Sequence, residues 1–311
     1  MRRVTAALGL VSLLACGGGG GSPTTGSRVA PTPSPRPSGW PAGTTVELVD
    51  GDTGRTVQGT VAVAGVTVPA GAPLANAAAV GVTVDVSVPG FLPRQTLVRT
   101  GEARLLLWPD SAAMPGDYTR SLVYTASAGT LDSMRRLPTS TRIVAVVPSA
   151  DIQGDPEAMD AHRAAIEAIN GATAPLGVTY RLGGTGDLSL PTKVDPSTDP
   201  CRDRMTRAFT SLWLSGANEI TRAEITFCGT AISATPGTVV HELGHTLGLR
   251  HSTDAHDMMY PYAQSSRPPA PTGREALAMS LMRARRSGTQ WPDNDRDATA
   301  AAAVRVEIVV D

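Results

Sequence analysis

One stretch of eleven residues constrains this chain more than any other. Residues 241–251 read His-Glu-Leu-Gly-His-Thr-Leu-Gly-Leu-Arg-His, which is the pattern HExxHxxGxxH. If the stretch begins as a helix, His241 and His245 project from the same face and can bind one metal ion together. Glu242, next to the first of them, is placed to take a proton from a water on that ion. The fold must therefore hold a helix with one face turned toward a metal centre.

The second glycine of this stretch predicts where the helix ends. Gly248 is the residue type that ends a helix in a left-handed turn at little steric cost. That turn would bring His251 back under the helix as a third ligand. Three protein nitrogens leave one position of a tetrahedral ion open, as in catalytic rather than structural zinc sites. The stretch therefore predicts Zn²⁺ as the cofactor and hydrolysis by a metal-activated water, with Glu242 as the general base.

The residues that follow carry a family resemblance. Met259 stands eight positions after His251, within Asp257-Met258-Met259-Tyr260-Pro261. From Pro236 to Pro261 the sequence closely resembles the metzincin zinc peptidases, and the matrixin branch in particular. The resemblance implies an α+β catalytic domain with a twisted mixed sheet and long helices, and an apolar floor beneath the metal formed by Met259. It also implies the ligands and the base at matched positions, namely His241, His245, His251 and Glu242.

Three other residues could be considered as metal ligands but are not expected to bind the metal. Tyr260 lies two residues after Met258, the offset at which astacin-like relatives use a tyrosine near the metal, but the spacing from His251 favours Met259 as the floor. We expect His256 to be a loop residue or a partner of a ligand. We expect His162 to be an exposed or capping residue of an earlier helix.

One departure from matrixins concerns the sheet edge that binds substrate. Only residues 229–235 separate the strand expected at 222–228 from the metal-binding helix. Either that strand is itself the edge, or the edge is reduced.

The N-terminus reads as an export signal. Arg2 and Arg3 precede an apolar run, Val4 to Ala15, that is too short to span a bilayer as a helix. The run ends in Leu-Leu-Ala followed by Cys16 and resembles a bacterial lipoprotein signal, with residues 1–16 as the signal region. The resemblance implies a lipid on Cys16 and a protein anchored to a bacterial membrane, facing the periplasm or the cell exterior. The alternative is an ordinary secretory signal.

Residues 17–110 precede the catalytic region. Residues 17–43 are rich in Gly, Pro and Ser and predict a flexible tether. Residues 44–110 predict a small β-sandwich, because short strand patterns alternate with turn clusters. The expected strands are 45–49, 56–63, 82–88 and 103–108. The segments 50–54 and 88–94 resemble carboxypeptidase regulatory-like modules, which favours a spacer or an accessory binding role.

Residues 111–311 form the expected metallopeptidase domain. A helix should begin after the acidic cap Asp155 and end at Asn170-Gly171, and another should follow Thr235. A short helix is expected at 208–214, from the spacing of Phe209, Leu212 and Trp213. The remaining expected elements are strands at 143–147, 177–182 and 222–228, a helix at 276–286 and an unplaced strand at 303–310.

The cysteines and a late acidic run leave local alternatives. With Cys16 assigned to lipid, Cys201 and Cys228 remain, either as a disulfide or as two free thiols. Asp293, Asp295 and Asp297 alternate as in a calcium loop, but the glycine and glutamate of such a loop are missing. An ordinary solvated acidic loop is expected there.

Composition and motifs narrow the function. The net charge of −1 offers no basic field for nucleic acid, and no serine-hydrolase or nucleotide motif is present. The expected activity is that of a zinc endopeptidase, a monomer acting on protein or peptide substrates. The alternatives are a surface-anchored binding lipoprotein with a structural metal site, and an amidase of cell-wall peptides. Glu242 argues against pure binding, which does not need that carboxylate.

Overall fold

The structure is a computed structural model that describes residues 39–125, 133–202, 206–262 and 268–295, and the backbone of 304–310. Among these residues no helix is both long and apolar enough to cross a bilayer. The expected signal with Cys16, residues 17–38 of the expected tether, and Asp297 lie outside the described residues. The expectation of a flexible tether was wrong for residues 39–43, because Trp40 is 2 % exposed and packs in the core of the module.

The largest sheet among the described residues is mixed and has six strands in the order β10-β9-β11-β13-β12-β14. The strands are β9 (Ile143–Pro148), β10 (Thr179–Leu182), β11 (Leu188–Val194), β12 (Ala208–Leu214), β13 (Ile220–Phe227) and β14 (Val304–Val310). The first four in sheet order are parallel, whereas β12 is antiparallel to both β13 and β14. The expectation of a mixed sheet is confirmed.

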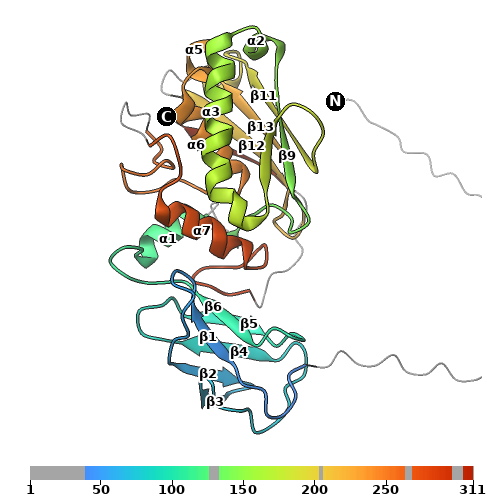
Figure 1. The fold of residues 1–311 in the computed structure, drawn as a ribbon, viewed down its shortest axis with the longest axis vertical. Helices are drawn as coiled ribbons and strands as arrows, with labels where there is room; N and C mark the ends of the chain where they lie inside the picture. Colours follow the sequence, from blue (N-terminus) through green and yellow to red (C-terminus); the bar gives the residue numbers. More distant parts are fainter. Residues whose placement is uncertain (1–38, 126–132, 203–205, 263–267, 296–303, 311) are drawn as a thin grey trace, which may run out of the picture. The chain divides into compact units, whose positions relative to one another are not determined.

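Two helices on this sheet contact each other, α3 (Pro156–Thr173) and α6 (Pro236–Thr246) (Figure 1). The Asp155 side chain caps α3 by accepting hydrogen bonds from the backbone N–H groups of Glu157 at 3.0 Å and Ala158 at 3.2 Å. The helix buries its alanine and isoleucine stripe in the main core. The helix continues past the expected end at Asn170-Gly171 to Thr173. The Asn170 amide hydrogen-bonds both backbone groups of Tyr180, at 2.7 and 2.9 Å, and so joins α3 to β10.

The other helices among the described residues are α1 (Gly116–Val123), α2 (Ala150–Gln153), α4 (Asp199–Arg202), α5 (Thr230–Ser233), α7 (Gly273–Arg283) and the 3₁₀ turn η1 (Ala174–Leu176). All of them except α7 are short. Helix α7 begins three residues earlier than expected because Thr272 and Glu275 form a capping box. Helix α1 and the small ladder of β7 (Tyr124–Thr125) with β8 (Ser133–Met134) were not expected.

The preceding module contains two sheets. An antiparallel sheet has the order β3-β2-β4-β5, and β1 pairs with β6 in parallel. The strands are β1 (Glu47–Asp50), β2 (Thr60–Val63), β3 (Val66–Pro69), β4 (Thr83–Ser87), β5 (Arg94–Leu97) and β6 (Arg104–Leu107). The expectation of strands at β1, β2, β4 and β6 is confirmed, and Val84 and Val86 point into a core shared by both sheets. Leu92 and Trp108 instead join the main core.

The expectation of a helix at 208–214 was wrong, because these residues form β12. Six of its seven residues are buried and Trp213 is half-buried. Both faces of the strand are therefore covered, and the period-2 alternation that marks a half-exposed strand is absent. The spacing of Phe209, Leu212 and Trp213 then imitates a helical stripe.

Neither alternative for the sheet edge holds, since β13 lies between β11 and β12, and β12 beside it is a full strand of seven residues. β12 precedes β13 in the sequence and lies between β13 and β14 in the sheet. This order could not be predicted from the sequence because residues 208–214 were expected to form a helix.

The acidic run is not a solvated loop, contrary to expectation. Asp293 and Asp295 are each 1 % exposed. Asp293 binds the Arg285 guanidinium through two contacts of 2.8 Å, and Asp295 binds Arg99 of the module at 3.3 Å. Arg99 lies 196 positions away in the sequence, so local reading could not pair it with Asp295.

Candidate metal centre

Helix α6 presents His241 and His245 from one face, as the four-residue spacing predicts. Their ring centroids are 4.8 Å apart, and the His251 ring lies 5.5 Å from the first and 5.0 Å from the second. The candidate ligand atoms of the three side chains all lie within 4.8 Å of one another. The structure thus brings together three imidazoles that are 10 positions apart in sequence at most.

A glycine turn delivers the third imidazole. Helix α6 ends at Thr246, and Gly248 has φ +102°, a positive φ as expected. A Cβ atom on Gly248 would lie 2.0 Å from the carbonyl oxygen of Arg135, so any side chain here would collide with backbone. Both the sign of φ and the close approach therefore require glycine before His251.

Backbone carbonyls set the orientation of two of the rings. The Nδ1 of His241 lies 2.7 Å from the carbonyl oxygen of Met258, and the Nδ1 of His245 lies 2.8 Å from that of Leu249. A carbonyl oxygen can only accept, so each Nδ1 carries the hydrogen and each Nε2 keeps its lone pair. That tautomer is the one in which a histidine binds metal through Nε2. The donor set therefore fits Zn²⁺, which favours neutral imidazole ligands.

Met259 lies directly beneath α6. A Cβ atom on Gly244 would be 2.4 Å from the Met259 sulfur and 2.9 Å from the Met258 methyl carbon. Both methionines are fully buried. The side chain of Met259 therefore packs on bare helix backbone between the two histidines of α6, which is compatible with an apolar floor.

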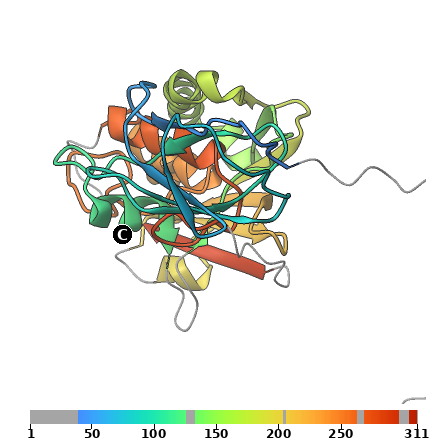
Figure 2. The ribbon, with the colours of Figure 1, turned by 90° about the horizontal axis from the view of Figure 1, so that it is seen from below.

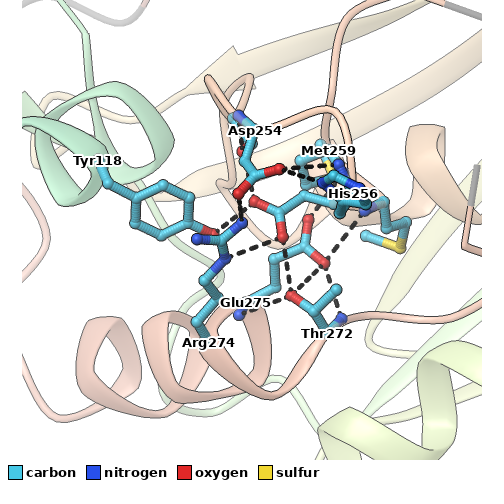
Figure 3. Close-up of polar contacts among 10 residues, drawn as sticks. Tyr118, Asp254, His256, Met259, Thr272, Arg274 and Glu275 are labelled. Atoms are coloured by element: carbon cyan, nitrogen blue, oxygen red, sulfur yellow. Dashed lines mark hydrogen bonds and ion pairs between the residues drawn. The ribbon is translucent and has the colours of Figure 1, made fainter. Parts of the chain in front are cut away.

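A buried carboxylate on α7 holds this methionine turn in place (Figure 3). Glu275, 0 % exposed, accepts hydrogen bonds from the backbone N–H of Met259 at 2.7 Å and of Met258 at 3.3 Å. It also accepts from the backbone N–H of Thr272 at 2.7 Å. Burial raises the pKa of Glu275, and these donors oppose that rise. Sequence reasoning missed Glu275, although Thr-Gly-Arg-Glu at 272–275 carries the capping-box pattern.

A second carboxylate, Asp257, joins the same turn to helix α1. It accepts from the Tyr118 hydroxyl at 2.8 Å and from Nε of Arg274 at 3.0 Å. The Arg274 guanidinium lies 4.3 Å from the Tyr118 ring centroid and also pairs with Asp254 (Figure 3). That bond holds the pKa of Asp254 well below its usual range. The exposed ring of His256 bonds Asp254 at 2.9 Å, so His256 is a loop residue.

Glu242 is fully buried beside the three histidines. The Thr210 hydroxyl, from β12, hydrogen-bonds the Glu242 carboxylate and lies 3.3 Å from the Glu242 carbonyl oxygen. A hydroxyl that donates a hydrogen bond to a carboxylate fixes the orientation of that carboxylate. Sequence reasoning missed Thr210 because that residue was placed on a helix rather than on the strand beneath α6.

His162 is buried, contrary to the expectation that it is exposed or capping. It is 0 % exposed, and its Nδ1 lies 2.8 Å from the carbonyl oxygen of Ala158. Its Nε2 lies 3.2 Å from the Thr192 hydroxyl, which must donate because Nδ1 holds the ring hydrogen. Burial lowers the pKa of His162. The expectation was wrong because the partner of His162, Thr192 on β11, lies 30 positions away and cannot be recognised from the pattern of the helix.

Cys201 and Cys228 form a disulfide with a Cα–Cα distance of 5.1 Å. Cys228 directly follows β13 and Cys201 lies in α4. The bond ties the segment before β12 to the end of β13.

One comparison with known protein families matches the part of the chain that holds this centre. The family model described as Matrixin matches residues 218–271, which span β13, α6, the three histidines and Met259. Among solved structures, metalloproteinase-II from Bacteroides fragilis is similar at 14 % identity and a TM-score of 0.32, covering 65 % of this chain and 76 % of that chain. No curated protein matches the chain.

Proposed function

We propose that this chain is a zinc-dependent endopeptidase that hydrolyses bonds in protein or peptide substrates. The observation that carries the proposal is the convergence of His241, His245 and His251 within 4.8 Å. Glu242, whose side chain is the expected base, is adjacent to the first ligand. The Matrixin match to residues 218–271 supports the same reading.

The chain's own residues have separable roles in this proposal. When bound, zinc supplies Lewis-acid chemistry that activates water and polarises a carbonyl group. Glu242 takes a proton from the attacking water and returns one to the leaving amine. The Thr210 hydroxyl holds the Glu242 carboxylate in place, and backbone carbonyls hold the rings of His241 and His245. Preorganisation of this kind lowers the reorganisation needed during reaction.

Two alternatives remain distinct from endopeptidase activity. A binding lipoprotein would use the metal only for structure, and an amidase of cell-wall peptides would use the same centre on another substrate. Glu242 beside the histidines favours hydrolysis over binding. Digestion of a protein substrate, compared with digestion of cell-wall peptide fragments, distinguishes the two hydrolases.

The finer assignments belong to the same proposal. The peptidase is matrixin-like, and Met259 is its metal floor. Residues 1–16 are a lipoprotein signal, Cys16 is acylated, and the protein is an exported monomer held at a bacterial membrane, facing the periplasm or the exterior. The module at 44–110 is a carboxypeptidase regulatory-like sandwich that acts as a spacer or accessory binding domain.

Glu242→Gln tests the base assignment. We expect the variant to retain one zinc per chain, measured by metal analysis after dialysis, and to lose peptide cleavage. Wild-type cleavage should stop on addition of a chelator and return with zinc. Full turnover by Glu242→Gln would remove Glu242 as the base, and zinc-free protein with full turnover would remove the metallopeptidase proposal.

A further inference from the structure

The last described strand of the chain lies on the outer side of β12. β14 pairs antiparallel with β12 at every position of that strand, from Ala208 opposite Val310 to Leu214 opposite Val304. In sheet order it follows β12 and ends the sheet (Figure 2, red strand). Among the described residues, β14 therefore takes up the hydrogen-bonding edge of β12.

β12 is also the strand that reaches the candidate metal centre. Its residue Thr210 contacts Glu242, and α6 packs on β12. In the β12–β14 ladder, Thr210 is opposite Ile308. The ladder position closest in register to the catalytic carboxylate is thus filled by residue 308 of the same chain.

A strand edge beside a hydrolytic site is a binding surface for an extended peptide. Its free N–H and C=O groups pair with any strand that lies alongside, largely independently of side chains. One edge accepts only one strand at a time. A peptide that paired with the outer side of β14 instead would lie one strand spacing, about 4.8 Å, further from Glu242.

We propose that residues 304–310 are an intramolecular occupant of the peptide-binding edge of β12. A substrate strand and β14 compete for this edge, so the chain is held in a low-activity state until β14 leaves. The inference rests on the proposed function and adds its regulation.

Because β14 is the last strand of the sheet, its release breaks fewer backbone hydrogen bonds than the release of an inner strand. In the described part of the sheet it pairs with β12 alone, whereas β13 pairs with strands on both sides. Detaching β14 breaks a single ladder and leaves the other five strands hydrogen-bonded. The β-branched residues Val304, Val306 and Ile308 suit the extended form that a competing peptide would also adopt.

The direct test is peptide binding, which does not depend on turnover. The probe is a fluorescent peptide of sequence Val-Arg-Val-Glu-Ile-Val-Val, titrated by anisotropy into the zinc-loaded Glu242→Gln chain with and without residues 304–311, so that the probe is not cut during the titration. Cleavage is measured separately with Glu242 in place. We expect the shortened chain to bind at least about tenfold more tightly, as for an edge that is open no more than a tenth of the time in the full chain. A peptide of scrambled sequence, with the same composition, controls for non-specific adhesion.

A point variant guards against misfolding of the shortened chain. Ile308→Pro in the full chain disfavours β14 pairing, since proline lacks the N–H and is poorly accommodated in a ladder. It should bind the probe as the shortened chain does, whereas Val66→Pro, in the module's strand β3, should not change binding. On the unaltered chain, excess probe should raise hydrogen exchange of the amides of 304–310.

The outcomes separate this inference from the proposed function. Tighter binding by the altered chains without any cleavage would retain the edge competition and reject the peptidase. Tighter binding with faster cleavage supports both. Equal binding by the folded full chain, the shortened chain and Ile308→Pro, or no exchange response at 304–310, would overturn the inference.

Discussion

The sulfur of Met259 packs against the backbone of Gly244, where a Cβ atom would be only 2.4 Å from it. Gly244 lies between the two histidines of α6, so this contact couples the methionine turn to the ligand-bearing helix. A residue that looks like a variable position of the HExxH pattern is therefore a packing requirement here.

Gly244→Ala should loosen the metal centre. The added methyl group must displace Met259 or Met258, and overpacking of this kind costs about 1–3 kcal/mol. We expect a lower melting temperature and weaker zinc retention, measured by thermal unfolding and chelator competition. Gly171→Ala is the control, because a Cβ on this exposed α3 residue meets nothing within 4 Å and helical alanine is favoured. Equal behaviour of the two variants would refute the packing argument.

Glu275→Ala should weaken zinc binding without touching a ligand. It leaves the buried amides of Met258 and Met259 without their acceptor, at a cost of about 1–3 kcal/mol for each unsatisfied group. The carbonyl of Met258 orients His241, and loss of such a support typically costs 10–100-fold in metal affinity. Zinc affinity by competition with a chelator is the readout, and Glu167→Ala, on the exposed face of α3, is the control. An unchanged zinc affinity would show that the Met258–Met259 turn keeps its conformation without Glu275.

His162 should make stability decline in acid. Burial lowers the pKa of His162 in the folded chain below its value of 6.5 in the unfolded chain. As the pH falls below 6.5, His162 binds a proton in the unfolded chain but stays neutral in the folded chain. The contribution of His162 to the free energy of unfolding is therefore present above pH 6.5 and is lost as the pH falls below it. The limiting slope is about 1.4 kcal/mol per pH unit.

His162→Gln should flatten this slope, measured as the free energy of unfolding in urea between pH 5 and 8. His256→Gln, at an exposed ring, should leave the slope as it is in the wild type. A wild-type slope in His162→Gln would contradict the assignment of a neutral buried imidazole.

The Cys201–Cys228 disulfide should contribute to stability by constraining the unfolded chain. Its two residues are 27 positions apart, for which loop closure predicts roughly 3–4 kcal/mol. The double variant Cys201→Ser/Cys228→Ser should therefore unfold at lower denaturant concentration than the wild type under oxidising conditions. Under strong reducing conditions the two proteins should converge, and a persisting difference would point to packing rather than the bond.

The amino-acid sequence by itself determined the local parts of the centre. His241 and His245 share a face because helix geometry repeats every 3.6 residues. Gly248 ends the helix, and Asp155 and Pro156 begin α3, through contacts within one turn of the chain. Such features depend on near neighbours, whose distances follow from chain geometry alone.

Tertiary structure alone decided the rest. Residues 208–214 form a strand because both faces are covered, which no pattern along the chain reveals. The burial of His162, the pairing of Asp295 with Arg99 and the position of β14 beside β12 each depend on a partner at least 30 positions away. Those contacts form only when the chain folds around a shared core. Burial there removes the water that would otherwise hydrogen-bond each polar group, so the group must pair with another part of the chain.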